Sequence, residues 1–388
     1  MVPHPFSNRS RDEVRALAAQ CAADIARLVS HADDAAFAAP RSAAARAATL
    51  EVADDLTAIN ALFMEKRWGD GLPLIPPTRE RVAGMLRGTV RPADEVIARI
   101  APGFGAATVE RIAINAVMAG CEPAHMPVLI AASGAVTGRE FNLQGVQTTT
   151  DPVAVWLIVN GPVARELNMN SGANCLGQGN RANTTLGRAL RLILQNIGGA
   201  LPGEMDRATQ GQPGKIAFCC AENEAENPWQ PLHVERGFKP EQSTVTVVGA
   251  EGTMNMHSYG KNADDILRVF ADTMAHGPSN EYVHGGEPWI VLSPEHAEIL
   301  HAAGYNKAGV QAKLWELSKM KAGRMTPEDR GRAQASRGGV LGTIGEETLL
   351  TIAHTPADIA IIVAGGPGAH TVYIPCFGNT RSVTREIA

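Results

Sequence analysis

The sequence predicts an α/β fold with a mixed sheet and flanking helices, preceded by an N-terminal helical segment. Two observations carry this prediction. All 39 glycines of the 388-residue chain lie at Gly69 or beyond it, and the Ala-rich stretch before Gly69 suits helices. From about residue 150 onward, short continuous apolar runs alternate with helical stretches, which is typical of buried strands connected by helices.

The chain is expected to have three parts, and the glycine distribution sets the first boundary. They are an N-terminal Ala-rich helical segment (residues 1–68), a main α/β body (residues 69–260) and a C-terminal α/β portion (residues 261–388). Glycine-rich loops are where the backbone can take left-handed conformations or approach a ligand closely. We therefore expect the functional site to lie outside residues 1–68.

Two helices are expected in the N-terminal segment. Ser10 and Glu13 form a capping box, which starts a helix over residues 11–30. A second helix is expected over residues 42–67, because apolar residues recur there at helical spacing and the following Trp68-Gly-Asp-Gly71 ends it.

The main body begins with an extended strap and three helices. The prolines of LPLIPPT (residues 72–78) prevent a helix, so this segment should lie extended over the body. Thr78 is expected to cap the first helix, and Thr108 or its neighbour the second. The expected helices cover residues 79–88, 108–120 and 127–136.

The remaining elements follow from the alternating pattern. The apolar runs expected to form strands are residues 153–159, 216–220, 245–248, 289–292 and 359–364. The helical stretches are residues 183–197, 263–274, 294–303 and 309–320. The polar segment over residues 321–342 is expected to be an exposed loop or lid.

Charge and composition exclude several function classes. The net charge is −5, from 35 basic and 40 acidic residues without a long basic run, so nucleic acid is not an expected partner. The apolar run Val153–Val159 is too short to span a bilayer, and the first residues lack the apolar core of a signal peptide. We expect a cytoplasmic protein with no membrane partner. Its six cysteines contain no CxxC spacing and should be reduced thiols.

An Asn- and Gly-rich stretch before an apolar helix is the first candidate binding loop. It runs from Leu167 to Asn183, and its glycines allow backbone N–H groups to converge beside a helix N-terminus, where anions bind. The candidate substrate-binding residues here are Asn170, Ser171, Asn174, Asn180 and Arg181. The alternative is a structural turn in which Asn180 is an ordinary helix cap.

Acidic residues and histidines after predicted strands supply candidate catalytic groups. Glu222 and His233 follow one strand, and Glu251 and His257 follow the next, so that the two sets are expected to share a cleft. Arg181 and Arg236 would hold a substrate carboxylate or a similar group. The alternative is a solvated acidic loop in which His233 and Arg236 form surface ion pairs.

Two further features carry reactive groups. Cys121 and His125 are a candidate nucleophile and base, or else two metal ligands, although Cys121 lies at a helix C-terminus, where the dipole disfavours a thiolate. Gly366 and His370 belong to a Gly-rich loop that would approach an anionic or planar ligand, or else to a structural hairpin. His296 and His301 do not share a helix face, so no metal site is expected.

Five stretches together resemble a largely uncharacterised bacterial family. They are WGDGLPLIPPT (68–78), ATVERIAINAVMAGC (107–121), FNLQGVQTTTDP (141–152), NMNSGANCLGQGNRANTTLGRALRLILQNIGG (168–199) and WQPLHVERGF (229–238). Members of that family are associated with small proteins carrying a selenocysteine- or cysteine-Gly-Ser-Cys motif, and some are labelled thioredoxin-like. The resemblance covers most of residues 60–388 and supplies no catalytic residues. This chain contains no CGSC segment.

The leading functional hypothesis is an enzyme that binds a small anionic or polar substrate and cleaves or forms a carbon–heteroatom bond, as a lyase or hydrolase. Acid/base groups perform such chemistry, and the sequence requires no cofactor. One alternative is a cysteine-dependent thiol or redox enzyme that acts with a thiol-redox partner protein. Another is a non-catalytic binding subunit of a complex. A homodimer is expected, because the Ala-rich N-terminal helices suit a subunit contact.

Overall fold

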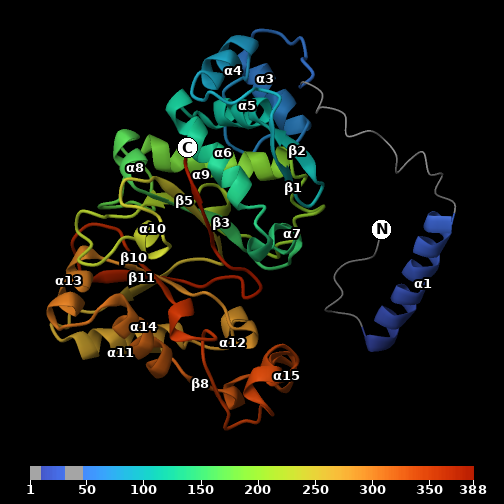
Figure 1. Cartoon of the computed structure of the whole chain (residues 1–388). Helices are drawn as coiled ribbons and strands as arrows, with labels where there is room; N and C mark the ends of the chain where they lie inside the picture. The colour runs from blue at the N-terminus through green and yellow to red at the C-terminus, as the bar shows by residue number, and fades with distance from the viewer. Residues whose placement is uncertain (1–9, 31–46) are drawn as a thin grey trace. The chain divides into compact units, whose positions relative to one another are not determined.

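The computed structural model describes residues 10–30 and 47–388 of the chain (Figure 1). The chain divides into two compact units, Met1–Ala45 and Arg46–Ala388. In the first unit, α1 (Arg11–Ser30) has the predicted bounds. The predicted capping box is present, because the Glu13 carboxylate accepts from the Ser10 N–H at 2.7 Å and Ser10 Oγ accepts from the Glu13 N–H at 3.3 Å.

The second unit begins with a shorter helix than the sequence predicts. Of the expected helix over 42–67, residues 42–46 lie outside the described residues, and the structure has a helix only in α3 (Leu56–Glu65). The prediction over residues 47–55 is wrong because the carboxylate of Asp55 accepts from the Ala58 N–H at 2.7 Å, which starts the helix there. The expected strap follows, with the Ile75 N–H donating to the carbonyl of Met118 at 3.2 Å.

Helices cover the first part of this unit, around a two-stranded hairpin. As predicted, Thr78 and Thr108 cap α4 and α5, and Gly120 ends α5 with a φ of 88°. The bounds are α4 (Arg79–Leu86), β1 (Val96–Ile100), β2 (Gly105–Thr108), α5 (Val109–Ala119), α6 (Met126–Ala135), α7 (Leu143–Thr148), α8 (Pro162–Glu166) and α9 (Arg181–Asn196). The helix α9 packs on α5 and on the first large sheet.

The first four-stranded sheet has the order β12-β5-β3-β4. Its central strand pairs in parallel with β4 and in antiparallel with β5, so the sheet is mixed as predicted. The strands are β3 (Ala154–Asn160), β4 (Cys219–Ala221), β5 (Thr244–Ala250) and β12 (Val383–Glu386). The short helix α10 (Leu232–Glu235) lies between β4 and β5 in the chain.

The second four-stranded sheet has the order β10-β7-β11-β6 and is also mixed. Its strands are β6 (Met254–His257), β7 (Trp289–Leu292), β10 (Ala360–Val363) and β11 (His370–Ile374), and the helices of this part are α11 (Ala263–Met274), α12 (Asn280–His284), α13 (Pro294–Ala302) and α14 (Lys307–Leu317). In Figure 1 these helices lie at the lower end of the unit, and α4 to α6 lie at its upper end.

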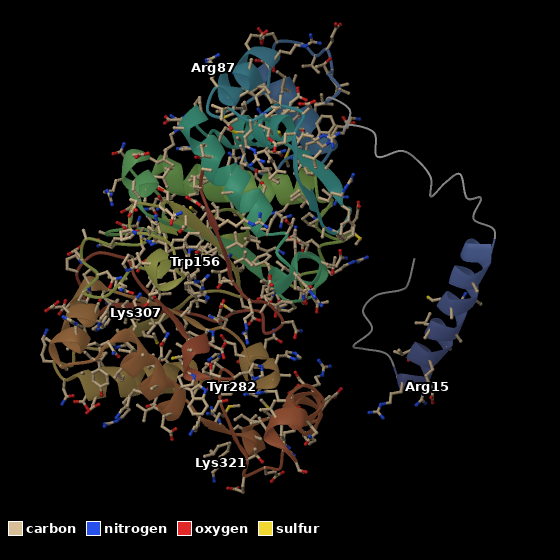
Figure 2. The ribbon with its side chains drawn as sticks, in the orientation of Figure 1. Arg15, Arg87, Trp156, Tyr282, Lys307 and Lys321 are labelled. Atoms are coloured by element: carbon tan, nitrogen blue, oxygen red, sulfur yellow. The ribbon has the colours of Figure 1, made fainter. Side chains whose placement is uncertain are left out.

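The two sheets meet at a buried aromatic contact. Trp156 of β3, labelled in Figure 2, meets Trp289 of β7 edge to face with ring centroids 5.6 Å apart.

Strands of both sheets end on the same side. β6 and β7 run in the same direction because β11 is antiparallel to both, and β10 is parallel to β7. The ends of β4 and β10 then meet through the Asn223 N–H and the Val363 carbonyl, 2.7 Å apart. We call the side where β3, β4, β6, β7 and β10 end the carboxyl edge, and the opposite side the amino edge.

The polar segment over residues 321–342 is a helix, so the prediction of a loop or lid is wrong for most of it. α15 (Pro327–Leu341) is capped by Thr326, and Arg337 on its inner side is buried. The Arg337 guanidinium donates to the carbonyls of Tyr282 and Thr351, at 3.1 and 2.7 Å. These tertiary bonds stabilise a helix that lacks an apolar face. Short strands β8 (Met320–Lys321) and β9 (Leu349–Leu350) pair nearby.

Among the described residues, no helix has both the length and the apolar character needed to cross a lipid bilayer.

Candidate functional site

Three loops that the sequence singled out meet at the carboxyl edge. The Ala221 N–H faces the carbonyl of Asn170 at 3.5 Å, and the Gly365 N–H donates to the carbonyl of Ser171 at 2.8 Å. With the bond between Asn223 and Val363, these contacts join residues 170–173, 221–223 and 363–366. We call this arrangement the three-loop junction. Ligands of α/β proteins bind at such an edge, outside the carboxyl ends of the strands.

Two hydrogen-bond donors lie where the loops touch. A Cβ atom added at Gly366 would lie only 3.0 Å from the Cβ of Ala173, so glycine permits the close approach. Within the described part of the chain, neither the Ser171 hydroxyl nor the Gly366 N–H has a hydrogen-bond partner. Both groups are half-buried and can therefore still meet a ligand.

The Glu222 carboxylate at this junction is buried and accepts hydrogen bonds from three donors. Its side chain accepts from Asn160 Nδ2 at 2.6 Å, from the Leu232 N–H at 2.8 Å and from Asn227 Nδ2 at 2.9 Å. Only 3% of the residue is exposed, and burial raises the pKa of its carboxyl. These bonds fix the turns after β3 and β4 rather than present a free carboxylate to a substrate.

His233 lies beside the same network and is also buried. Its Nδ1 atom is 3.6 Å from Glu224 Oε1, and Glu224 in turn accepts from Asn160 Nδ2 at 3.1 Å and from the Gly161 N–H at 2.7 Å. The structure thus brings Glu222 and His233 to one network, as an acid/base pair would require. Because His233 is 1% exposed, a substrate cannot reach its ring in this conformation.

Two accessible histidines occupy the same edge of the second sheet. His257 ends β6 and His370 begins β11, and the two residues are directly paired across the strands. Both are exposed, with ring centroids 6.1 Å apart. His370 Nδ1 is also 3.1 Å from Asn255 Oδ1, which orients its ring. His370 directly continues the loop that contains Gly366.

The two arginines predicted to hold a carboxylate bind other groups of the protein. Arg181 pairs with Glu122 at 2.6 Å and donates to the carbonyl of Gly120, so it closes the end of α5. Arg236 donates to the hydroxyls of Thr384 and Ser382 and stacks over Trp289, 5.5 Å from its ring centroid. These contacts could not be predicted from the sequence, because every partner is remote along the chain.

The asparagines of the Asn/Gly-rich loop mainly shape the loop itself. Asn170 accepts from the Gly172 N–H, and Asn174 Nδ2 donates to the carbonyl of Gln178. Asn180 caps α9 through the Asn183 N–H, as the structural alternative supposed. The loop conformation is therefore built from its own asparagine side chains.

Cys121 has the environment of an inert core thiol. It is buried against Thr185, whose carbonyl lies 3.4 Å from its Sγ atom. Burial raises the pKa of the thiol to about 12, so it is protonated at neutral pH. A nucleophilic role would require the thiolate, which this site disfavours.

The predicted cleft shared by Glu222 and Glu251 is wrong. β5 is antiparallel to β3, so Glu251 follows a strand end at the amino edge, whereas Glu222 lies at the carboxyl edge. There Asn280 Nδ2 donates to Asp151 Oδ2 and to Glu251 Oε1, at 2.6 Å each. Burial, and then the neighbouring Asp151, raise the pKa of Glu251 to about 9. Sequence reasoning missed Asp151, which precedes β3.

The surface also has a hollow of about 560 Å³. It is lined by Lys261–Asp264 and Ala303–Tyr305, and no residue that the sequence singled out contributes to it. In residues 10–30 and 47–388, the structure groups no three His, Cys, Asp or Glu side chains in a way that could hold a metal ion.

No protein-family model matches the sequence, and no curated protein matches it either. The family resemblance of the five stretches therefore stays a prediction.

Proposed function

We propose that this chain is an enzyme that binds a small anionic or polar substrate at the carboxyl edge and catalyses a lyase or hydrolase reaction by acid/base chemistry. The observation that carries the proposal is the convergence of three polar loops at the carboxyl edge, where the second sheet also carries the paired His257 and His370. In this proposal the Ser171 hydroxyl and the Gly366 N–H hold a substrate oxygen.

His257 and His370 are the proton-transfer groups in this proposal. An imidazole ring can act as a general acid or a general base, so one ring can accept a proton while the other donates one. Glu222 and His233 become positioning residues, because their contacts fix the loops and leave neither side chain accessible. This assignment differs from the sequence-based hypothesis, in which both were catalytic along with His257 and Cys121.

The thiol alternative has less support than the acid/base one, because the pKa of Cys121 is raised. The sequence-based expectations of a cytoplasmic location and a homodimer are part of the same proposal. They depend on the charge pattern and on the Ala-rich N-terminal segment, as does the absence of a nucleic-acid partner.

The first prediction concerns the two histidines. The purified chain is incubated with a panel of small hydroxy acids, carboxylic acids and their amides, and products are identified by mass spectrometry. For a substrate that is turned over, His257→Gln and His370→Gln should each lower kcat by about 10²- to 10⁴-fold, the usual contribution of a general acid or base. One limb of the pH–rate profile should disappear in each variant.

His301→Gln is the matched control, because His301 is an exposed histidine on α13. It should leave kcat unchanged. If both test variants retained the activity and pH profile of the original chain, while Glu222→Gln abolished turnover without loss of folding, the catalytic role would return to Glu222.

A further inference from the structure

Neighbouring cysteines of β4 face opposite sides of the sheet. Cys219 packs into the core that contains Cys121 and α9, whereas Cys220 packs with Trp156 and Phe218 between the two sheets. Cys175, from the Asn/Gly-rich loop, belongs to that second cluster. Two cysteines that are remote along the chain therefore meet in one small apolar cluster.

A hydrogen-bonded clamp holds Cys175 next to Cys220. The residue after Cys220 contacts the loop through the Ala221 N–H and the Asn170 carbonyl. Asn183 Nδ2 donates to the carbonyl of Asn170 at 2.8 Å and to that of Cys175 at 3.0 Å, which ties the two ends of this turn together. These contacts hold the turn that carries Cys175 beside β4, and Cys175 and Cys220 belong to the same apolar cluster.

The two thiols differ in access and acidity. Cys175 is 5% exposed and sits in a loop whose Ala173, Asn174 and Gly177 are exposed, whereas Cys220 is 0% exposed in a strand. The neighbouring Cys220 thiol lowers the pKa of Cys175, whereas the Cys175 thiol and burial together raise the pKa of Cys220. Cys175 is thus the thiol that an incoming reagent meets first and the one that ionises more readily.

We propose that Cys175 and Cys220 are a redox modification site, at which a reversible disulfide fastens the Asn/Gly-rich loop to β4. The oxidant is a small-molecule disulfide. The Cys175 thiolate attacks it to form a mixed disulfide and releases one thiol; Cys220, after losing its proton, attacks the Cys175 sulfur and releases the second. Two protein thiols are oxidised to one disulfide, and one reagent disulfide is reduced to two thiols.

The linkage would act on the three-loop junction without depending on the function proposed for it. Cys175 lies four residues after Ser171 in the same loop, so a bond to β4 would restrict the motion of that loop. The modification is detected by mass, and its presence or absence says nothing about turnover at His257 and His370.

The test uses the full chain, folded, in buffers with oxidised glutathione, followed by acid quenching and peptide mapping under non-reducing conditions. The expected result is a peptide linked through Cys175 and Cys220, which dithiothreitol reverses. Half-buried Cys21 serves as an internal check that the reagent is active. If Cys21 became glutathionylated while Cys175 and Cys220 both stayed reduced, the proposal would be overturned.

Three variants test the order of the steps. Cys220→Ser should accumulate a glutathione adduct on Cys175, because the resolving thiol is missing, whereas Cys175→Ser should leave Cys220 unmodified. Cys219→Ala, which removes the neighbouring buried thiol, should form the Cys175–Cys220 disulfide like the original chain. A linkage of Cys220 to any other cysteine would contradict the assignment. The mapping of the original chain stands even if a variant fails to fold.

Discussion

Two carboxyl groups show how neighbouring contacts decide the role of a buried side chain. Glu222 is fixed by three donors, and burial raises its pKa. Glu251 shares Asn280 with Asp151, and like charges cannot both ionise at such a separation without cost. Glu251 therefore retains its proton at neutral pH, and its ionisation is coupled to unfolding.

This coupling predicts how stability depends on pH. The pKa of Glu251 is about 9 in the folded chain against an ordinary value of 4.5, so between these values the folded chain holds a proton that the unfolded chain has lost. The free energy of unfolding should fall as pH rises across this window, by up to about 1.4 kcal/mol per pH unit for one group.

Glu251→Gln should flatten that dependence, because the amide stays neutral at every pH. Urea unfolding at several values between about pH 6 and pH 8 would measure it. Glu298→Gln, at an exposed carboxyl on α13, is the control and should keep the original slope. An unchanged slope in Glu251→Gln would contradict the raised pKa.

At residue level, the sequence singled out loops that meet in the fold, but it did not predict the contacts of the side chains within them. Gly366 and Ser171 stand in loops that glycine and asparagine content singled out, and these loops do meet. The partners of Arg181 and Arg236 could not be predicted, because Glu122 and Thr384 approach them only in the folded chain.

Among the elements, capped helices were the most predictable. Ser10, Thr78 and Thr108 each start a helix as expected, because a cap is a local interaction between residues three apart. The direction of β5 could not be predicted, because parallel and antiparallel pairing give similar apolar runs in a buried strand. That direction placed Glu251 at the amino edge. α15 was missed because tertiary bonds to Arg337 replace an apolar face.

Two glycines near α4 give an element-scale prediction. A Cβ atom at Gly88 would lie 1.8 Å from the carbonyl oxygen of Pro123, so Gly88→Ala must push α4 away from the turn before α6. We expect a loss of about 3 kcal/mol in the free energy of unfolding.

Gly84→Ala is the matched control, since Gly84 lies inside α4 and a Cβ there makes only ordinary contacts, the nearest at 3.5 Å. It should stabilise the chain by about 0.5–1 kcal/mol, because alanine favours a helix over glycine. Chemical unfolding of both variants measures the difference. Equal stabilities would show that the close packing of Gly88 on Pro123 is absent in solution.

For the whole molecule, the division into two units predicts that residues 46–388 fold without the first unit. A chain truncated to these residues should unfold cooperatively, with a free energy of unfolding within about 1 kcal/mol of the full chain. If the N-terminal segment forms the proposed dimer contact, light scattering should show a dimer for the full chain and a monomer after truncation. A truncated chain without cooperative unfolding would contradict the division.

The proposed carboxyl-edge site is tested most directly by a crystal structure of the full chain soaked with the panel of small hydroxy and carboxylic acids. The ligand should accept hydrogen bonds from the Ser171 hydroxyl and the Gly366 N–H and lie within reach of His257 or His370. A ligand bound at the Asp151–Glu251 pair, or in the hollow beside Lys261, with none at the carboxyl edge, would contradict the account.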